Sequence, residues 1–112
     1  MMDKDSLLKI EVLYFNDCPS WKNTVKDLEL VLKELGIKKE ISFVAVETHK
    51  EAIKQKFTGS PTIRINDKDI FPNNQINYAL GCRVYLTPQG YKGTPTKEMI
   101  RTQIEELLLN YY

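Results

Sequence analysis

Hydrophobic residues follow two patterns along the chain, which are short continuous runs and a spacing of three or four positions. Each change of pattern marks a new element. Two short segments, residues 9–15 and 41–47, are nearly continuous apolar runs rich in β-branched and aromatic side chains. Runs of that length and composition are typical of strands buried in a sheet. We therefore predict one strand in each segment.

Between these runs, apolar residues fall three or four positions apart, which is the spacing of one helix face. The stripe consists of Trp21, Val25, Leu28, Leu32 and Leu35. Gly36 follows, and glycine commonly ends a helix. A shorter helix is predicted after the second strand, because Thr48 and Glu51 have the spacing of a capping box and Gly59 is placed to close it.

The second half of the chain is richer in turn residues. The stretch "SPTIRINDKDIF" predicts a hairpin of two strands, residues 62–65 and 69–71, around a turn at residues 66–68. Residues 76–80 favour one helical turn, residues 82–86 have the composition of a strand, and residues 87–93 resemble a loop.

A last helix is predicted near the C-terminus. Thr94 and Pro95 suit its N-cap and first helical position. One face of this helix carries Ile100, Ile104, Leu107, Leu108 and Tyr111. The predicted order is therefore β-α-β-α-β-β-α.

A strand-helix-strand unit requires a crossover between parallel strands, so this order predicts a small α/β sandwich with helices on both faces of the sheet. The chain has 112 residues, of which 42% are hydrophobic, and it contains no repeat or linker. That size suits one core, and we expect residues 1–112 to form a single domain.

Charge excludes some classes of partner. The chain has 16 Lys and Arg residues against 15 Asp and Glu, a formal charge of +1. Such a balance provides no general attraction to nucleic acid or to an anionic membrane. The apolar runs are too short to span a bilayer, and the N-terminal segment lacks the plan of a signal peptide. We expect a cytoplasmic protein with no nucleic-acid or membrane partner.

The chain has two cysteines, Cys18 and Cys82, and a single histidine, His49. In a reducing cytoplasm two cysteines are not expected to form a structural disulfide. They are instead expected to be free thiols, a transient redox pair or ligands of a soft metal. His49 has no neighbouring ligand set and is expected at the surface.

The predicted order, with "NDCPSW" after the first strand and "GSPTIRIN" at the start of the hairpin, resembles the thioredoxin fold over most of the chain. The later stretches "CRVYLTPQG" and "GTPTKEMI" are similar to small bacterial and archaeal thioredoxin-like proteins labelled alkylmercury-lyase-like. The resemblance implies a three-layer sandwich around a mixed sheet. It also implies that Cys18 is the nucleophilic cysteine and that Pro61 is a cis-proline beside it.

Two positions depart from the family pattern. Trp21 stands where a resolving cysteine would complete a Cys-x-x-Cys motif, and Val12 stands where thioredoxins carry a buried acid. Dithiol chemistry within the first motif is therefore excluded. The resemblance still implies that Ser60 and Pro61 dock an extended substrate next to Cys18.

The residues around Cys18 suggest a reactive thiol without reference to any family. If Pro19 is the first helical residue, Cys18 is the N-cap, and the free N–H groups and dipole of the helix favour its thiolate. The alternative is a small buried hydrophobic residue. Trp21 is either the first core residue of its helix or an aromatic wall of the thiol pocket.

Cys82 has two possible places. If residues 69–71 are the return strand of the hairpin, the following segment is long enough to bring Cys82 back to Cys18. If residues 82–86 are the return strand, Cys82 starts about 15 Å away at ~3.3 Å per residue, too far for a disulfide. We expect the nearer placement. Arg83 beside it is expected to be a solvated strand residue, and the alternative is a cation that lowers the pKa of a thiol or binds a substrate anion.

Three functions follow from these residues. The first is a thiol-disulfide oxidoreductase in which Cys18 attacks a protein or small-molecule disulfide and Cys82 or an external thiol resolves the product. The second is a two-thiolate site for Hg²⁺ or Cu(I) formed by Cys18 and Cys82. The third is an interaction module that has lost its thiol chemistry. No resident cofactor is implied, and the oligomeric state is left open.

Overall fold

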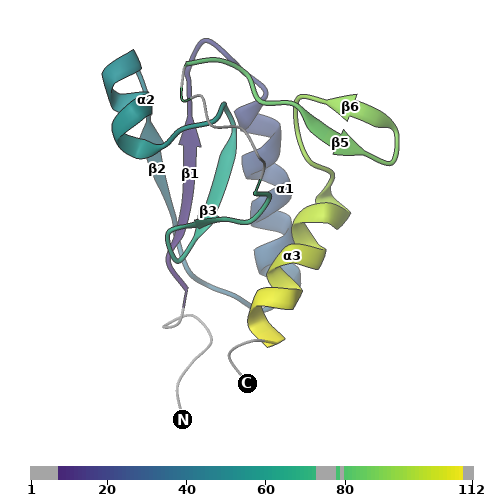
Figure 1. Cartoon of the computed structure of the whole chain (residues 1–112). Coiled ribbons are helices and arrows are strands. Elements are labelled where there is room, and N and C mark those ends of the chain that lie inside the picture. The colour runs from purple at the N-terminus through teal and green to yellow at the C-terminus, as the bar shows by residue number, and fades with distance from the viewer. Residues whose placement is uncertain (1–7, 73–77, 79, 110–112) are drawn as a thin grey trace.

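A four-stranded mixed sheet is the centre of the computed structural model, which describes residues 8–72, 78 and 80–109. The strands lie in the order β2-β1-β3-β4. β1 (Ile10–Tyr14) pairs in parallel with β2 (Ile41–Ala45) and antiparallel with β3 (Thr62–Ile65), which pairs antiparallel with the short β4 (Lys68–Asp69). Figure 1 shows β1 between its two neighbours.

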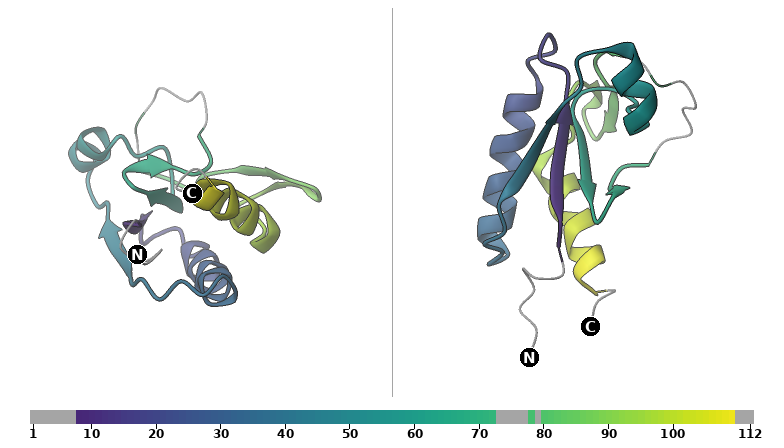
Figure 2. Two further views of the ribbon diagram at one scale, coloured as in Figure 1. Left: turned by 90° about the horizontal axis from the view of Figure 1, so that it is seen from below. Right: turned by 90° about the vertical axis from the view of Figure 1, so that its left-hand side faces the viewer.

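Helices cover both faces of this sheet. The helices are α1 (Trp21–Glu34), α2 (His49–Gln55) and α3 (Lys97–Leu109). α1 packs against α3 on one face, and α2 lies on the other, as two further views show (Figure 2). The predicted α/β class with a mixed sheet is therefore confirmed.

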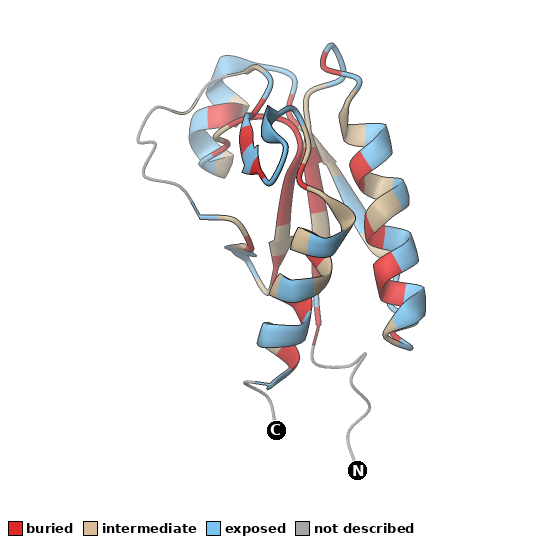
Figure 3. Cartoon of the chain, turned by 90° about the vertical axis from the view of Figure 1, so that its right-hand side faces the viewer, coloured by how far each residue is buried: buried red, intermediate tan, exposed pale blue. Residues whose placement is uncertain are grey.

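The side chains of β1 alternate between two hydrophobic clusters, one on each face of the sheet. Ile10 and Val12 point to the side of α1 and α3, whereas Leu13 points to Phe57 and the α2 side. Successive side chains of a strand face opposite sides of a sheet, so a run buried on both faces must be continuously apolar. Figure 3 shows the buried positions on the inner sides of strands and helices.

The predicted C-terminal end of α1 is correct, whereas its predicted start is displaced. Gly36 has φ of 72°, and the N–H groups of Gly36 and Ile37 bond to Lys33 and Leu32, which closes α1 as predicted. α1 begins after Ser20, however, and so Cys18 is not its N-cap and Pro19 is not its first residue. Pro19 instead begins the turn that leads into α1, in which its carbonyl accepts from the N–H of Lys22 at 3.2 Å.

The other two helices show a similar pattern. The hydroxyl of Thr48 accepts from the N–H of Glu51, so the N-cap half of the predicted capping box forms at α2, whereas the Glu51 carboxylate accepts from the N–H of Glu47. α2 ends at Lys56 in the left-handed conformation rather than at Gly59. α3 begins two residues later than predicted, because the Thr96 hydroxyl caps the N–H of Met99.

The segment between the hairpin and α3 differs most from expectation. β4 is Lys68–Asp69, and the turn before it consists of Asn66 and Asp67 alone, both at positive φ. Residues 87–93 were expected to be a loop, but β5 (Tyr85–Thr87) and β6 (Gly90–Lys92) form a second, two-stranded sheet. Most of the expected helical turn at 76–80 lies outside the described residues.

Among the described residues, no helix has the length and apolar character needed to cross a membrane.

Candidate thiol site

The two cysteines are joined. Cys18 and Cys82, separated by 64 positions in the sequence, form a disulfide with their Cα atoms 5.7 Å apart. Cys18 lies in the turn between β1 and α1, and Cys82 lies just before β5. The expected near placement of Cys82 is therefore correct, and the two cysteines are bonded to each other rather than free thiols.

A short backbone pairing holds Cys82 in place. Ser60 and Cys82 form a parallel bridge, in which the Ser60 N–H donates to the Gly81 carbonyl at 2.8 Å and the Arg83 N–H donates to the Ser60 carbonyl at 2.9 Å. The segment 81–83 thus runs like an added strand along the residue that precedes Pro61. Sequence reasoning missed this pairing because no apolar periodicity marks a single bridge.

Gly59 makes this approach possible. Its φ is +131°, and a Cβ atom on it would lie 2.8 Å from the Arg83 Cβ and 2.9 Å from the Arg83 Cα. Both the conformation and the space exclude a larger side chain. Gly59 was interpreted as a helix end, but its function is to let the segment with Cys82 lie against Ser60.

Cys18 is held by a turn and is buried. Its N–H donates to the Phe15 carbonyl at 3.0 Å, and only 3% of the residue is exposed. The Cys18 Sγ atom is 3.4 Å from the Ser20 hydroxyl oxygen and 3.9 Å from the Ser60 carbonyl oxygen. Because the sulfur in the disulfide carries no hydrogen, Ser20 is the donor of the first contact.

The two halves of the disulfide differ in access. Cys82 is an exposed residue, whereas Cys18 is buried beneath it. Access decides which sulfur of a disulfide an external thiolate can attack. A reagent from solvent therefore meets Cys82 first.

Ser60 and Pro61 lie beside the disulfide as the resemblance implies, and the peptide bond between them is cis. Both residues are buried. The backbone N–H and carbonyl of Ser60 are already bonded to Gly81 and Arg83. The positions at which an extended substrate was expected to pair are thus occupied by the protein's own chain, because the bridge to Cys82 uses the same groups.

Trp21 packs against two other aromatic rings. Its ring stacks on Tyr14 at 4.3 Å between centroids and meets Phe43 edge-on at 6.4 Å, with the Lys22 ammonium 5.8 Å from its centroid. These partners come from β1, β2 and α1 itself. The interpretation of Trp21 as a core-facing residue is favoured over a wall of the thiol pocket.

Arg83 was expected to be solvated, and this is wrong. It is 4% exposed, and it donates to the Asp69 carboxylate at 2.7 Å and to the Phe71 carbonyl. Its guanidinium carbon also lies 4.6 Å from the centroid of the Tyr85 ring. The two terminal nitrogens of the guanidinium are engaged with these groups, so the side chain serves to anchor the segment that carries Cys82.

Tyr85 completes the anchor. Its hydroxyl donates to the Pro61 carbonyl at 2.5 Å. Burial raises the pKa of this phenol above its ordinary value, the Arg83 charge opposes the rise and the Asp69 charge adds to it. Neither Asp69 nor Tyr85 was identified from the sequence, since a turn residue and a strand residue gave no signal of their contact with the site.

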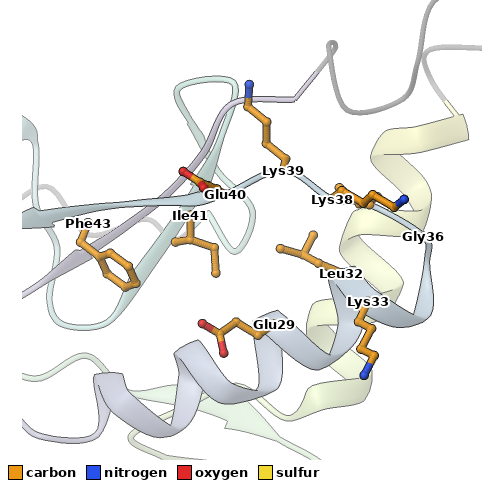
Figure 4. A pocket seen from close by; sticks show the side chains of 10 residues that line it. Glu29, Leu32, Lys33, Gly36, Lys38, Lys39, Glu40, Ile41 and Phe43 are labelled. Atoms are coloured by element: carbon orange, nitrogen blue, oxygen red, sulfur yellow. The ribbon is translucent and has the colours of Figure 1, made fainter.

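No other centre of metal or acid-base chemistry is evident in the part of the chain that the structure describes. Those residues contain no group of three or more His, Cys, Asp and Glu side chains placed to hold a metal ion. A groove of about 510 Å³ lies between the C-terminal half of α1 and β2 (Figure 4). Its lining includes Gly36, at the end of α1 opposite to the disulfide.

Comparison of the chain with protein-family models, with curated proteins and with solved structures finds no match.

Proposed function

We propose that this protein is a thioredoxin-like thiol-disulfide oxidoreductase whose redox pair is Cys18 and Cys82. One observation carries the proposal: two cysteines 64 positions apart are joined at the junction of β1 and α1, with one of them exposed. The pair replaces the missing second cysteine at Trp21. An exposed disulfide is the form in which such a protein accepts electrons.

The arrangement of the elements supports a thioredoxin-like fold. A sheet with the order β2-β1-β3-β4, one parallel pair and helices on both faces fits the order of elements in that fold. The Cys-Pro element directly follows β1, and Pro61 directly precedes β3. The hairpin of β5 and β6 is an addition to the seven predicted elements.

The greater solvent exposure of Cys82 than of Cys18 determines the order of the chemical steps that we propose. In the reduced protein the exposed Cys82 thiolate attacks one sulfur of a substrate disulfide, which forms a mixed disulfide and releases the first substrate thiolate. The Cys18 thiolate then attacks the Cys82 sulfur, which restores the internal disulfide and releases the second substrate thiolate. Two electrons pass from the protein thiols to the substrate. This order reverses the roles expected from the sequence because Cys18 is buried.

The surroundings of Cys18 suit a resolving and leaving thiolate. The Ser20 hydroxyl can donate to its sulfur, and the N-terminus of α1 begins directly after Ser20. Both features stabilise a negative charge on sulfur. A better leaving thiolate accelerates opening of the disulfide from the Cys82 side. Arg83 is not needed for this effect, since Asp69 neutralises it.

A redox role also fits the expected compartment. A permanent disulfide is at odds with a reducing cytoplasm, where protein disulfides are chiefly transient and catalytic or sensing. We therefore retain the cytoplasm as the proposed location. The substrate class is a protein or small-molecule disulfide that reaches Cys82 from solvent.

The adjacent sulfurs also favour a second function, a two-coordinate site for Hg²⁺ or Cu(I) in the reduced protein. The two thiols lie within reach of one ion. Among the described residues, no His, Asp or Glu side chain joins the two cysteines to form a group of three possible ligands. Soft ions accept two thiolates. Titration of the reduced protein with Hg²⁺ or Cu(I) would show one equivalent bound and both thiols protected from alkylation.

Trapping of the mixed disulfide tests the redox proposal. Cys18→Ser protein mixed with oxidised glutathione should accumulate an adduct on Cys82, detected by intact mass, because the resolving thiol is absent. Cys82→Ser protein should react much more slowly, since Cys18 is buried. Equal reduction of a test disulfide by wild type and by the Cys18→Ser/Cys82→Ser double variant would refute the proposal.

The reduction potential distinguishes a redox pair from a structural staple. Structural disulfides have potentials below about −300 mV, whereas catalytic pairs are more oxidising. Equilibration of the protein with glutathione or thioredoxin-type buffers measures this value. A potential below that limit would indicate a purely structural disulfide.

A further inference from the structure

β2 presents an open edge of the sheet. Among the described residues β2 pairs with β1 alone, so one side of its backbone faces outward. The Val46 N–H donates to the Tyr14 carbonyl at 2.8 Å, which fixes the even-numbered residues as those that bond to β1. By alternation, the N–H and carbonyl groups of Ile41, Phe43 and Ala45 point to the open side.

Within the described residues, this edge lacks the central charge, proline and bulge that commonly protect an edge strand against pairing. Proteins blunt an edge strand with a central charge, a proline or a bulge. β2 reads "ISFVA" and contains no charge and no proline, and its register with β1 runs without a bulge over five residue pairs. Phe43 at its centre is 50% exposed. The strand is therefore suited to bind another strand.

Charge complementarity identifies a second copy of the chain as the occupant. Lys39 and Glu47 are exposed and flank β2, each two residues beyond one end of the strand. If two copies of β2 pair antiparallel about a two-fold axis at Phe43, Lys39 of each copy lies opposite Glu47 of the other. Ile41 of each copy then lies opposite Ala45 of the other, and these two residues use outward-facing backbone groups.

The groove beside β2 fits the same arrangement. Ile41 and Phe43 point from β2 toward α1, and Leu32 points back from α1 (Figure 4). The edge-on contact of Phe43 with Trp21 continues this apolar surface toward β1. In the paired register the two Phe43 rings lie opposite one another on this face, and aromatic pairs across strands stabilise a sheet.

We propose that the protein forms a two-fold symmetric dimer in which β2 pairs antiparallel with β2 of a second copy, in the register that places Lys39 opposite Glu47. The two sheets then form one continuous sheet of eight strands. A two-fold interface uses the same patch on both subunits, which requires a self-complementary strand such as this one. The proposal is independent of the chemistry at Cys18 and Cys82.

A charge exchange tests both the partner and the register. Lys39→Glu places like charges opposite Glu47, and Glu47→Lys does the same with Lys39, so each variant should raise the dimer dissociation constant about tenfold or more. The double variant Lys39→Glu/Glu47→Lys restores opposite charges and should dimerise like wild type. Lys92→Glu, which makes the same charge change on the exposed strand β6, is the matched control.

Mass measured by sedimentation or light scattering from about 1 μM to about 1 mM covers the range of a weak to moderate dimer. Hydrogen exchange gives a second readout, because the outward-facing amides of Phe43 and Ala45 should gain protection as the concentration rises. A wild-type protein that stays monomeric over this range would overturn the proposal, and so would a charge exchange that fails to restore the dimer. A dimer insensitive to both single variants would also overturn it.

Discussion

The close approach of Gly59 to Arg83 makes a quantitative prediction about the substitution Gly59→Ala. A φ of +131° lies outside the conformations that alanine adopts readily, which costs about 1–3 kcal/mol. The new Cβ would also lie within 3.0 Å of the Arg83 backbone, an overlap that typically costs about 1–3 kcal/mol more. We expect the oxidised protein to lose about 3–5 kcal/mol of its free energy of unfolding.

Two other glycines provide matched controls. Gly36→Ala meets a positive φ but no atom within 4 Å, so it should cost only the conformational term of about 1–2 kcal/mol. Gly93→Ala meets the Ser20 side chain at an ordinary 3.6 Å and should be nearly neutral. The difference between Gly59→Ala and Gly36→Ala therefore reports the clash together with the larger backbone cost at the φ of Gly59.

Urea unfolding followed by the fluorescence of Trp21, the only tryptophan, measures these differences. With a slope of about 1–3 kcal/mol per molar, the midpoint of Gly59→Ala should fall by about 2 M. Displacement of the segment with Cys82 should also make the disulfide easier to reduce, by about tenfold or about 30 mV. A Gly59→Ala protein no less stable than Gly36→Ala would refute the argument.

Three further changes test the rest of the site. Cys82→Ser should lower stability relative to the oxidised wild type by about 4 kcal/mol in chemical denaturation, since the bond closes a loop of 64 residues. Asp69→Ala leaves the buried Arg83 cation without its partner and should cost about 3–5 kcal/mol, part of which Arg83→Leu should recover in the double variant. Because the folded pKa of Tyr85 is raised by burial, its contribution to stability is complete below about pH 10 and is lost as the pH rises further. Tyr85→Phe should flatten that alkaline loss while costing about 1 kcal/mol at neutral pH through the hydrogen bond to Pro61.

The elements with a regular pattern could be predicted from the sequence. The apolar run around β1, the helical stripe that ends at Gly36 and the capping box at Thr48 all correspond to observed structure. In each case neighbouring residues determine the outcome, because hydrophobic periodicity and helix capping are local. The starts of α1 and α3 were misplaced by two residues, since a proline that suits the first helical position can also stand just before the helix.

The thiol site depended on contacts between distant segments. The sequence supplied both cysteines and two alternative distances between them, but the choice required the bridge between Ser60 and Cys82. The burial of Arg83, its pairing with Asp69 and the need for Gly59 are likewise properties of the packed structure. They involve residues 14 to 24 positions apart, and the sequence next to each residue contains no pattern that indicates the contact.

The sequence by itself determined an α/β order of elements and the absence of a second cysteine at Trp21, because each follows from residues close together in the chain. Only the tertiary structure decided that Cys82 is the partner, that Cys18 is the buried member and that β2 is left with an open edge. Burial and strand pairing are properties of surfaces brought together by folding, and therefore no single segment encodes them.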